Sequence, residues 1–293
     1  MTWWCTGVRW RGGGPMFGWT GDGDGSERES AVRFGEGMAF RVAGPRRCLG
    51  VWRGGRRRLC PGWDAVPVRG TRAQCAECAG IDRAQSVAAD TMADDPRPYH
   101  VYLAWFGDGL VKVGITGVGR GSARLLEQGA VAFTWLGRGP LMAARRAEEL
   151  LRVALGVPDR ISYETKRVVR GAAVSRGAED ELARAHAVAG GLGGWPESLE
   201  RMPCEVVGHA EVFGLAAVDG VDAVVSGLAE GAVVAGRVVA AAGPDLHLVE
   251  RGGRRLVVDT RVLAGWPLEG VGDGVTGSSV EVREVPGVQG GLF

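Results

Sequence analysis

The sequence predicts an α+β protein, and three features of the chain lead to this prediction. Two apolar, β-prone runs flank a Gly-Asp-Gly turn over residues 100–116, and patterns typical of helices follow them. Short strand-like runs punctuated by Gly and Pro fill the first 45 residues and return after Pro196. Between these blocks, four Cys lie close together in a stretch with few periodic segments. The chain has 293 residues, enough for two or three compact domains.

The first 95 residues divide into two segments. Residues 1–45 form an N-terminal β segment, with apolar runs over 3–11 and 16–19 and a further strand-like run over 31–43. Residues 46–95 form a Cys-rich module in which we expect one short helix, over 82–90. Asp94-Asp-Pro-Arg-Pro closes the module as a linker, because each Pro disfavours helix in the residue before it.

Residues 96–192 form a small α/β block. After the hairpin we expect a helix over 121–128, a strand over 130–136, and helices over 140–155 and 178–189. Residues 193–285 are β-rich, with strands over 204–209, 231–242, 246–250 and 254–263, and 286–293 form a flexible tail. Neither terminal region has enough strands for a good core, so the two are expected to share one sheet or small barrel.

The register of the hairpin decides which side chains share a face. A three-residue loop over 107–109 pairs 106 with 110, 104 with 112 and 102 with 114. Tyr102 and Lys112 then lie on one face beside Gly114, where the phenol and the amine are expected to be exposed. Leu103, Trp105, Val111 and Val113 form an apolar face on the other side. A two-residue Asp-Gly turn would shift this register by one.

One acidic residue interrupts an apolar helix face. Leu141, Ala144, Glu148, Leu151 and Leu155 are spaced by three and four residues, which puts them on one stripe. A carboxylate on a buried stripe is costly unless it is paired, binds a metal or borders a cleft. Glu148 is therefore a candidate site residue, with an edge position paired to an Arg as the alternative.

These residues together resemble the GIY-YIG nucleases. Val-Tyr-Leu-Ala with Tyr102, Val-Lys-Val-Gly-Ile-Thr with Gly114, Arg124 on the next helix and Glu148 in Ala-x-x-x-Glu-x-x-Leu match that family's motifs. The combination is most similar to a bacterial branch known as domain of unknown function 2797, in an actinobacterial form. The similarity is strongest over residues 99–160 and implies that residues 96–192 are a GIY-YIG-like domain.

The resemblance implies metal-dependent hydrolysis of a phosphodiester in nucleic acid. Tyr102, Lys112, Arg124 and Glu148 would be the catalytic residues, and Glu148 would hold Mg²⁺ or Mn²⁺. Gly114, Thr116 and Arg120 would contact the substrate. Two features depart from the family: Lys112 replaces a Tyr often proposed as general base, and no clear Asn follows the acidic helix. A nucleic-acid-binding protein without catalysis is therefore the second hypothesis.

The Cys cluster predicts a structural metal site. Cys48, Cys60, Cys75 and Cys78 have the spacing x11, x14, x2, and only the last pair is a Cys-x-x-Cys motif. Four thiolates fit tetrahedral Zn²⁺, and a segment poor in apolar periodicity needs a metal to fold it. An iron–sulfur cluster, with the same ligand type, and four unconnected thiols are the alternatives. Cys5 and Cys204 are expected in the core.

Composition predicts a cytoplasmic protein. No apolar run approaches the roughly 20 residues of a membrane span, and the N-terminus lacks a leader pattern. The formal net charge is +1, but nine Arg and one acidic residue lie between Arg41 and Arg72. This local excess suits a polyanion, with a solvated loop as the alternative. All but two of the basic residues are Arg, which is typical of a GC-rich bacterial genome.

The C-terminus suggests a further partner. Gln289-Gly-Gly-Leu-Phe293 is similar to the short Gln-x-x-Leu-Phe peptide by which bacterial repair proteins dock on the DNA sliding clamp. A scaffolding protein that docks through this tail is the third functional hypothesis. The four His, at 100, 186, 209 and 247, lack a ligand-like spacing, and only His100 adjoins the hairpin motif.

Overall fold

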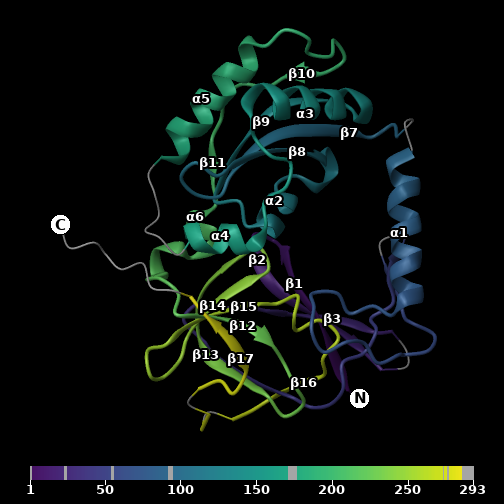
Figure 1. Cartoon of the computed structure of the whole chain (residues 1–293), viewed down its shortest axis with the longest axis vertical. Helices are drawn as coiled ribbons and strands as arrows, with labels where there is room; N and C mark the ends of the chain where they lie inside the picture. The colour runs from purple at the N-terminus through teal and green to yellow at the C-terminus, as the bar shows by residue number, and fades with distance from the viewer. Residues whose placement is uncertain are drawn as a thin grey trace, which may run out of the picture. The chain divides into compact units, whose positions relative to one another are not determined.

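The computed structural model describes residues 2–22, 25–53, 56–91, 95–170, 177–272, 274–275 and 277–285. The chain divides into two compact units (Figure 1). One is built from both ends of the chain, Met1–Ala89 with Gly220–Phe293, and the other is the continuous segment Asp90–Asp219. The described residues contain both helices and sheets, which confirms the predicted α+β class.

The continuous unit is built on an antiparallel sheet with the order β10-β9-β7-β8, and β11 also pairs with β9. Its strands are β7 (Pro98–Trp105), β8 (Val111–Gly117), β9 (Ala132–Pro140), β10 (Glu200–Arg201) and β11 (Val207–Gly208). Its helices are α2 (Ala123–Gln128), α3 (Leu141–Leu155), α4 (Tyr163–Arg170), α5 (Ala178–Gly191) and α6 (Ala210–Phe213). The hairpin strand β7 lies inside this sheet, between β9 and β8.

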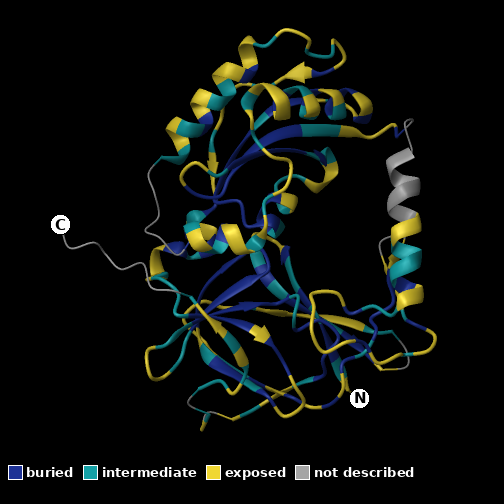
Figure 2. Cartoon of the chain, in the orientation of Figure 1, coloured by how far each residue is buried: buried dark blue, intermediate teal, exposed yellow. Residues whose placement is uncertain are grey.

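The predicted hairpin register is confirmed. Tyr102 pairs with Gly114 and Ala104 with Lys112, and the Phe106 N–H donates to the Leu110 carbonyl at 3.0 Å, which closes the three-residue loop. Figure 2 shows that β7 and β8 are mostly buried.

Different helices cover the two faces of the hairpin. The Trp105 Nε1 donates to Glu181 of α5 at 2.7 Å, so α5 lies on the apolar face. Tyr102, Ala104 and Phe106 pack instead against Leu125 of α2. The face that carries the candidate site residues is thus covered by α2.

The described residues of the discontinuous unit form three sheets. A three-stranded sheet is formed by β1 (Trp3–Arg11), β2 (Gly14–Gly21) and β3 (Glu27–Ala31). A two-stranded ribbon is formed by β5 (Val51–Arg53) and β6 (Arg56–Arg58), and helix α1 (Ala76–Thr91) follows it along the chain. A seven-stranded sheet has the order β16-β4-β13-β14-β15-β12-β17 and consists of β4 (Gly37–Val42), β12 (Ala223–Gly227), β13 (Val233–Ala242), β14 (Asp245–Val249), β15 (Arg255–Asp259), β16 (Leu268–Gly270) and β17 (Glu281–Glu284).

The expected pairing of the two ends of the chain is confirmed. Strand β4 lies between β16 and β13, and Val233 to Arg237 of β13 pair with residues 37–41. The Cys5 N–H also donates to the Trp266 carbonyl at 2.9 Å. The seven-stranded sheet therefore takes β4 from the N-terminal part of the chain and its other strands from the C-terminal part.

Several element bounds differ from the sequence prediction. Helix α1 begins at Ala76 rather than at residue 82, and the predicted helix over 121–128 begins at Ala123. Helix α4 was not predicted, because its buried positions are occupied by Lys166 and Arg170. A buried helix face is recognised in a sequence by apolar residues at these positions. Among the described residues, none of the helices combines the length and apolar character needed to cross a membrane.

Candidate functional site

The hairpin holds a tyrosine ring directly over a glycine. Tyr102 on β7 faces Gly114 on β8. A Cβ atom on Gly114 would lie 2.4 Å from the Tyr102 Oη and 2.5 Å from its Cζ, closer than real Cβ contacts allow. Glycine at 114 is therefore required by the position of the phenol. The same register places Lys112 two residues away on the same face.

Tyr102 and Lys112 are both buried, with 2 % and 8 % exposure. The Gln128 Nε2 donates to the Tyr102 Oη at 2.9 Å, and the Lys112 Nζ donates to the Asp159 backbone carbonyl at 2.9 Å. The expectation that this face exposes a phenol and an amine is therefore wrong. Helix α2 and the segment that follows α3 cover both groups and supply their hydrogen-bond partners.

Glu148 lies on the predicted stripe of α3 and is partly buried, next to the buried Leu151. Its neighbour Glu149 is exposed and pairs with Arg152 at 2.6 Å. Burial raises the pKa of the Glu148 carboxyl, and the positive charge of Lys112 acts in the opposite direction. The two adjacent glutamates thus occupy different environments, as the helical spacing predicts.

Two arginines near the start of α2 share one carboxylate. The Arg120 Nη2 contacts the two carboxylate oxygens of Glu127 at 2.7 and 2.8 Å, and the Arg124 Nη1 lies 3.8 Å from the same group. The Arg124 side chain is 48 % exposed. Its positive charge nevertheless contributes to the lowered pKa of Lys112, and it partly offsets the effect of burial, which raises the pKa of Tyr102.

The electrostatics of the site connect the four predicted catalytic residues. Burial, followed by the charge of Arg124, lowers the pKa of Lys112 to about 8, while Glu148 and Asp159 act to raise it. Burial raises the pKa of the Tyr102 phenol, and Glu148 adds to that effect. The charges of Arg124 on α2 and Glu148 on α3 therefore both act on the buried Tyr102 and Lys112.

The predicted substrate-binding residues differ in how accessible they are. Gly114 is covered by the Tyr102 ring, and Thr116 is 5 % exposed opposite His100. Only Arg120 is exposed, and it is held by Glu127. The structure thus brings Tyr102, Lys112 and Gly114 together on one face of the hairpin, but it does not present all the predicted substrate contacts to solvent.

Three residues of this neighbourhood were missed by the sequence analysis. Gln128 binds Tyr102, and its place four residues after Arg124 on one helix was a usable signal. Asp159 contributes its backbone carbonyl, which leaves no trace in a sequence pattern. Lys166 is 2 % exposed, donates to the Gln128 carbonyl at 3.0 Å and lies 4.0 Å from the centre of the Phe106 ring.

His100 is the only histidine beside the hairpin motif. Its ring stacks on Trp135 with centroids 4.4 Å apart, and burial lowers its pKa. Within the described part of the chain, its buried Nδ1 has no hydrogen-bond partner. His209 is a core residue with its Nδ1 2.9 Å from the Ala130 carbonyl, and the His186 Nε2 contacts the Met202 carbonyl.

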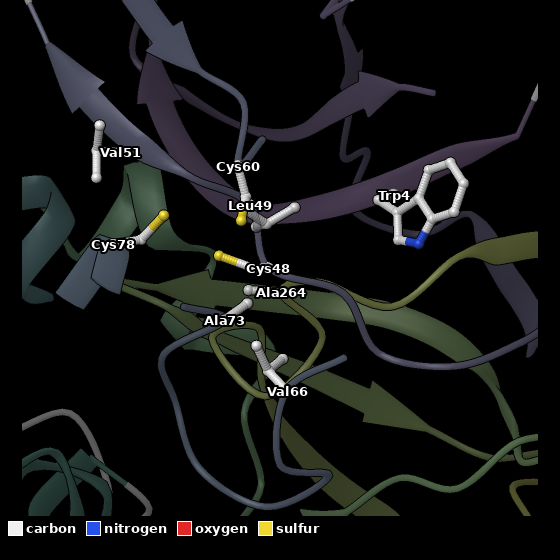
Figure 3. Close-up of a cluster of buried hydrophobic side chains, with 9 residues drawn as sticks. All are labelled: Trp4, Cys48, Leu49, Val51, Cys60, Val66, Ala73, Cys78 and Ala264. Atoms are coloured by element: carbon white, nitrogen blue, oxygen red, sulfur yellow. The ribbon is translucent and has the colours of Figure 1, made fainter. Parts of the chain in front are cut away.

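The four predicted Cys ligands come together in the discontinuous unit. The sulfur atoms of Cys48, Cys60, Cys75 and Cys78 all lie within 4.8 Å of one another. Figure 3 shows Cys48, Cys60 and Cys78 turned toward a common space in a buried cluster. The Cys60 and Cys75 sulfurs are 3.8 Å apart, which is the separation of two ligands about 2.3 Å from a tetrahedral Zn²⁺. The donor set can therefore hold a structural metal ion such as zinc.

Backbone N–H groups surround these sulfurs. The N–H groups of Gly50 and Cys75 donate to the Cys48 Sγ at 3.4 and 3.2 Å. Burial raises the pKa of the Cys48 and Cys78 thiols. For Cys60, burial acts in the same direction, but N–H donors from Asp64 and other contacts outweigh it and lower the pKa of that thiol. A divalent cation would favour the thiolate form of all four.

The sequence around this cluster contains a repeated pattern that was not used in the prediction. Cys48 and Cys60 are each followed two residues later by Gly, and each thiol receives a hydrogen bond from that glycine. Gly50 has φ +71°, and a Cβ atom there would lie 2.0 Å from the Arg58 carbonyl oxygen. The turn that brings its N–H to the sulfur is therefore available only to glycine.

The two remaining cysteines behave differently from each other. Cys5 is buried, as predicted, and burial raises the pKa of its thiol to about 12. Cys204 is exposed, so its predicted place in the core is wrong. It lies in the irregular segment between β10 and β11, where short strands leave side chains uncovered. The tail Gln289–Phe293 lies outside the described residues, so clamp docking stays a prediction.

A family model described as a protein of unknown function (DUF2797) matches residues 35–268, which include both the Cys cluster and the hairpin site. Neither a curated protein nor a solved structure matches the chain.

Proposed function

The chain belongs to the DUF2797 family, and we propose that it is a metal-dependent phosphodiesterase acting on nucleic acid. The supporting observation is the neighbourhood of Tyr102, Lys112, Arg124 and Glu148, whose charges act on one another although they come from four elements. The resemblance of the hairpin and the two helices to GIY-YIG nucleases supports the same reaction class. The proposal is specific to this group of residues.

Glu148 would hold a single Mg²⁺ or Mn²⁺. Its carboxylate is the hard oxygen donor that these ions prefer, and one carboxylate plus substrate phosphate is a common way of binding Mg²⁺. Its partly buried position and raised pKa indicate a carboxylate that gains from a nearby cation. When bound, the ion would polarise the phosphate and stabilise the leaving oxygen.

Lys112 would accept the proton of the attacking water. With a pKa of about 8, a fraction of its side chain is a neutral amine near pH 7.5, and a general base works best with a pKa near the working pH. Tyr102 has a raised pKa and stays protonated, so its hydroxyl would orient water or phosphate by hydrogen bonding. Arg124, the most exposed of the four, would bind phosphate oxygens with its forked guanidinium.

A second candidate function is nucleic-acid binding without cleavage. The burial of Tyr102 and Lys112 favours it, because each is already engaged by a protein partner, Gln128 or the Asp159 carbonyl. Under this alternative, the four predicted catalytic residues stabilise the fold and have no catalytic role. Binding that depends on salt, without any cleavage, would support it.

We also propose that Cys48, Cys60, Cys75 and Cys78 hold a structural Zn²⁺. The four-sulfur donor set and the 3.8 Å separation of Cys60 and Cys75 support zinc. An iron–sulfur cluster has the same ligands and remains the alternative. Metal analysis and the visible absorption spectrum of protein purified without added metal distinguish the two.

Substituting Glu148→Gln tests the nuclease proposal. The control is Glu149→Gln, which removes the same charge from the next residue of the same helix, where the carboxylate is exposed and paired with Arg152. Cleavage of duplex, branched and single-stranded DNA and RNA is measured with Mg²⁺ or Mn²⁺. We expect a loss of roughly 10²-fold or more for Glu148→Gln, the order seen when one group that stabilises a transition state is removed, and wild-type rates for Glu149→Gln.

Circular dichroism of both variants establishes that the fold is intact. Equal cleavage by the two variants would remove Glu148 from the mechanism. If the wild-type protein binds these substrates but cleaves none of them with either metal, the binding-only alternative is supported instead.

A further inference from the structure

The last residue of helix α2 is bound through both its side chain and its backbone. Gln128 is 6 % exposed, and its Nε2 donates to the Tyr102 Oη at 2.9 Å. Its backbone carbonyl accepts a hydrogen bond from the Lys166 Nζ at 3.0 Å. Gly129, with φ +70°, follows it and ends the helix. The backbone of Gln128 is thus held by contacts that do not use its carboxamide.

Helix α4 fixes the end of α2 from the other side. Lys166 is 2 % exposed, and its Nζ lies 4.0 Å from the centre of the Phe106 ring and 4.6 Å from that of Tyr163. The Tyr163 Oη donates to the Glu127 carbonyl at 3.2 Å. Two successive carbonyls of α2 therefore accept hydrogen bonds from α4, which places the Gln128 side chain against the hairpin.

The direction of the hydrogen bond decides what the phenol can do. A phenol has one proton to donate and lone pairs that accept. Because the Gln128 carboxamide donates to the oxygen, the proton of Tyr102 is left for another acceptor. Among the described residues, none accepts a hydrogen bond from this hydroxyl. A buried donor without an acceptor is costly, and Tyr102 is 2 % exposed, which indicates an acceptor from outside the chain.

The same helix carries the residue proposed to bind phosphate. Arg124 lies four residues before Gln128, so both side chains leave α2 on one face. Burial raises the pKa of the Tyr102 phenol, Gln128 and Arg124 act to lower it, and Glu148 of α3 acts to raise it. The Lys112 Nζ lies 6.0 Å from the centre of the phenol ring. Gln128 therefore joins the phenol to the helix that presents the guanidinium.

We propose that Gln128 is a positioning residue, which fixes the Tyr102 hydroxyl as a hydrogen-bond donor to the substrate phosphate or to the attacking water. The inference rests on the proposed function, because it names the group that orients Tyr102 for that reaction. A fixed donor aimed at developing negative charge stabilises the transition state. Without the carboxamide, the phenol is free to turn its proton toward another acceptor, and this alignment is lost.

Two substitutions of Gln128 test its carboxamide, and both leave the backbone carbonyl that Lys166 binds. Gln128→Met keeps a similar length but cannot donate. Gln128→Glu keeps the shape but replaces the donor with an acceptor, which would take the phenol proton. Tyr163→Phe is the matched control, because it removes a hydrogen bond at the same end of α2 and keeps the ring beside Lys166. Circular dichroism establishes that each variant is folded.

Cleavage of the DNA and RNA substrates is measured with Mg²⁺ or Mn²⁺ at a series of substrate concentrations. We expect kcat to fall roughly tenfold or more in both Gln128 variants, with KM unchanged, because the lost bond acts on the reacting group rather than on substrate binding. Tyr163→Phe should keep the wild-type kcat. If both Gln128 variants cleave at the wild-type rate, the carboxamide does not position the phenol.

A double-mutant cycle separates positioning from a purely structural role. In a Tyr102→Phe background there is no hydroxyl for Gln128 to hold, so adding Gln128→Met should change the single-turnover rate by less than about twofold. If Gln128 only stabilises the fold, the same substitution lowers the rate equally in both backgrounds. Equal losses would therefore overturn the proposal.

The hydrogen bond can also be observed without cleavage. The chain has three tyrosines, so protein labelled with ¹³C at the Tyr Cζ gives three signals, of which Tyr102→Phe identifies one. In Gln128→Met this signal should shift, whereas the signal of Tyr99, whose hydroxyl binds Asp95, should stay. A Tyr102 signal that does not move would show that Gln128 does not hold the phenol.

The two proposals fail in different ways. If the wild-type protein cleaves none of the substrates, the proposed function fails, and the role of Gln128 fails with it. If the wild-type protein cleaves, Glu148→Gln does not, and Gln128→Met does so at the wild-type rate, the positioning role alone is wrong.

Discussion

The two lysines of this chain stand apart from its many arginines. Lys112 and Lys166 are the only Lys residues, and both are buried, with 8 % and 2 % exposure. Each donates to a backbone carbonyl, of Asp159 and Gln128 respectively. A compact ammonium fits such a place, and unlike a guanidinium it can lose its proton there. The buried environment of these two positions therefore suits lysine better than arginine.

The lowered pKa of Lys112 predicts a pH dependence of stability. Its pKa is about 8 in the folded protein, against about 10.4 when unfolded. Between these values the unfolded chain binds more protons, so the free energy of unfolding should rise with pH, by at most about 1.4 kcal/mol per pH unit. Below pH 8 both states are protonated and this rise is absent. Urea denaturation at a series of pH values should show the rise in wild-type protein and not in Lys112→Met.

The same group can be observed directly. In protein labelled with ¹³C-lysine, only two side-chain ε-carbon signals are expected, and Lys112→Met identifies one of them. Its titration midpoint should lie near pH 8. A midpoint at the ordinary lysine value would contradict the prediction and remove Lys112 as a base.

At the scale of elements, the hairpin was predictable and helix α4 was not. Alternating apolar residues and a Gly-Asp-Gly turn predicted the hairpin, and the three-residue loop, one of the two turns that the sequence allowed, gives the observed register of β7 and β8. Helix α4 instead buries Lys166 and Arg170, because aromatic rings and carbonyls of other segments receive the Lys166 charge. Burial of Tyr102 and Lys112 was unpredictable for the same reason: the covering groups come from α2 and the segment after α3.

Removing the metal should loosen the β5–β6 ribbon. Chelation would leave four thiols in the core that anchors it, and metal binding to such sites is a main source of folding energy. Trypsin should then cut after Arg53, Arg56 or Arg58 faster, by roughly tenfold for each ~1.4 kcal/mol lost from the opening free energy. Mass spectrometry of timed digests with and without a zinc chelator measures this.

Sites in the continuous unit are the internal control for that digest. Cleavage after Arg145 or Arg152 of α3 should keep its rate when the metal is removed, since α3 belongs to the other unit. If chelation leaves cleavage in the ribbon unchanged, the cluster does not stabilise it.

For the whole molecule, the sequence predicts which regions are β-rich, but it does not predict which individual strands pair with each other. The expected sharing of strands between the two ends is confirmed by β4 and β13. The order of the seven strands, with β12 parallel to β15 and antiparallel to β17, could not be predicted. Pairing over such long separations depends on packing in the finished sheet, and short Val-rich runs resemble one another too closely to identify it.

The division into two units predicts how fragments behave. Residues 90–219 are one continuous compact unit and should fold alone, with a cooperative thermal transition and a dispersed NMR spectrum. Residues 1–89 should not, because β4 would lack both neighbours, β13 and β16. A cooperative transition in 1–89, or a molten 90–219, would contradict this division.

The split of the first unit also has a consequence for biosynthesis. About 190 residues separate β4 from its partner β13, so the ribosome needs roughly 10–40 s at 5–20 residues per second to supply that partner. Throughout this interval the nascent chain carries an unpaired strand edge, which is a template for aggregation. All four Cys ligands, in contrast, emerge within 31 residues. Metal capture can therefore organise the first segment of the chain long before its sheet can close.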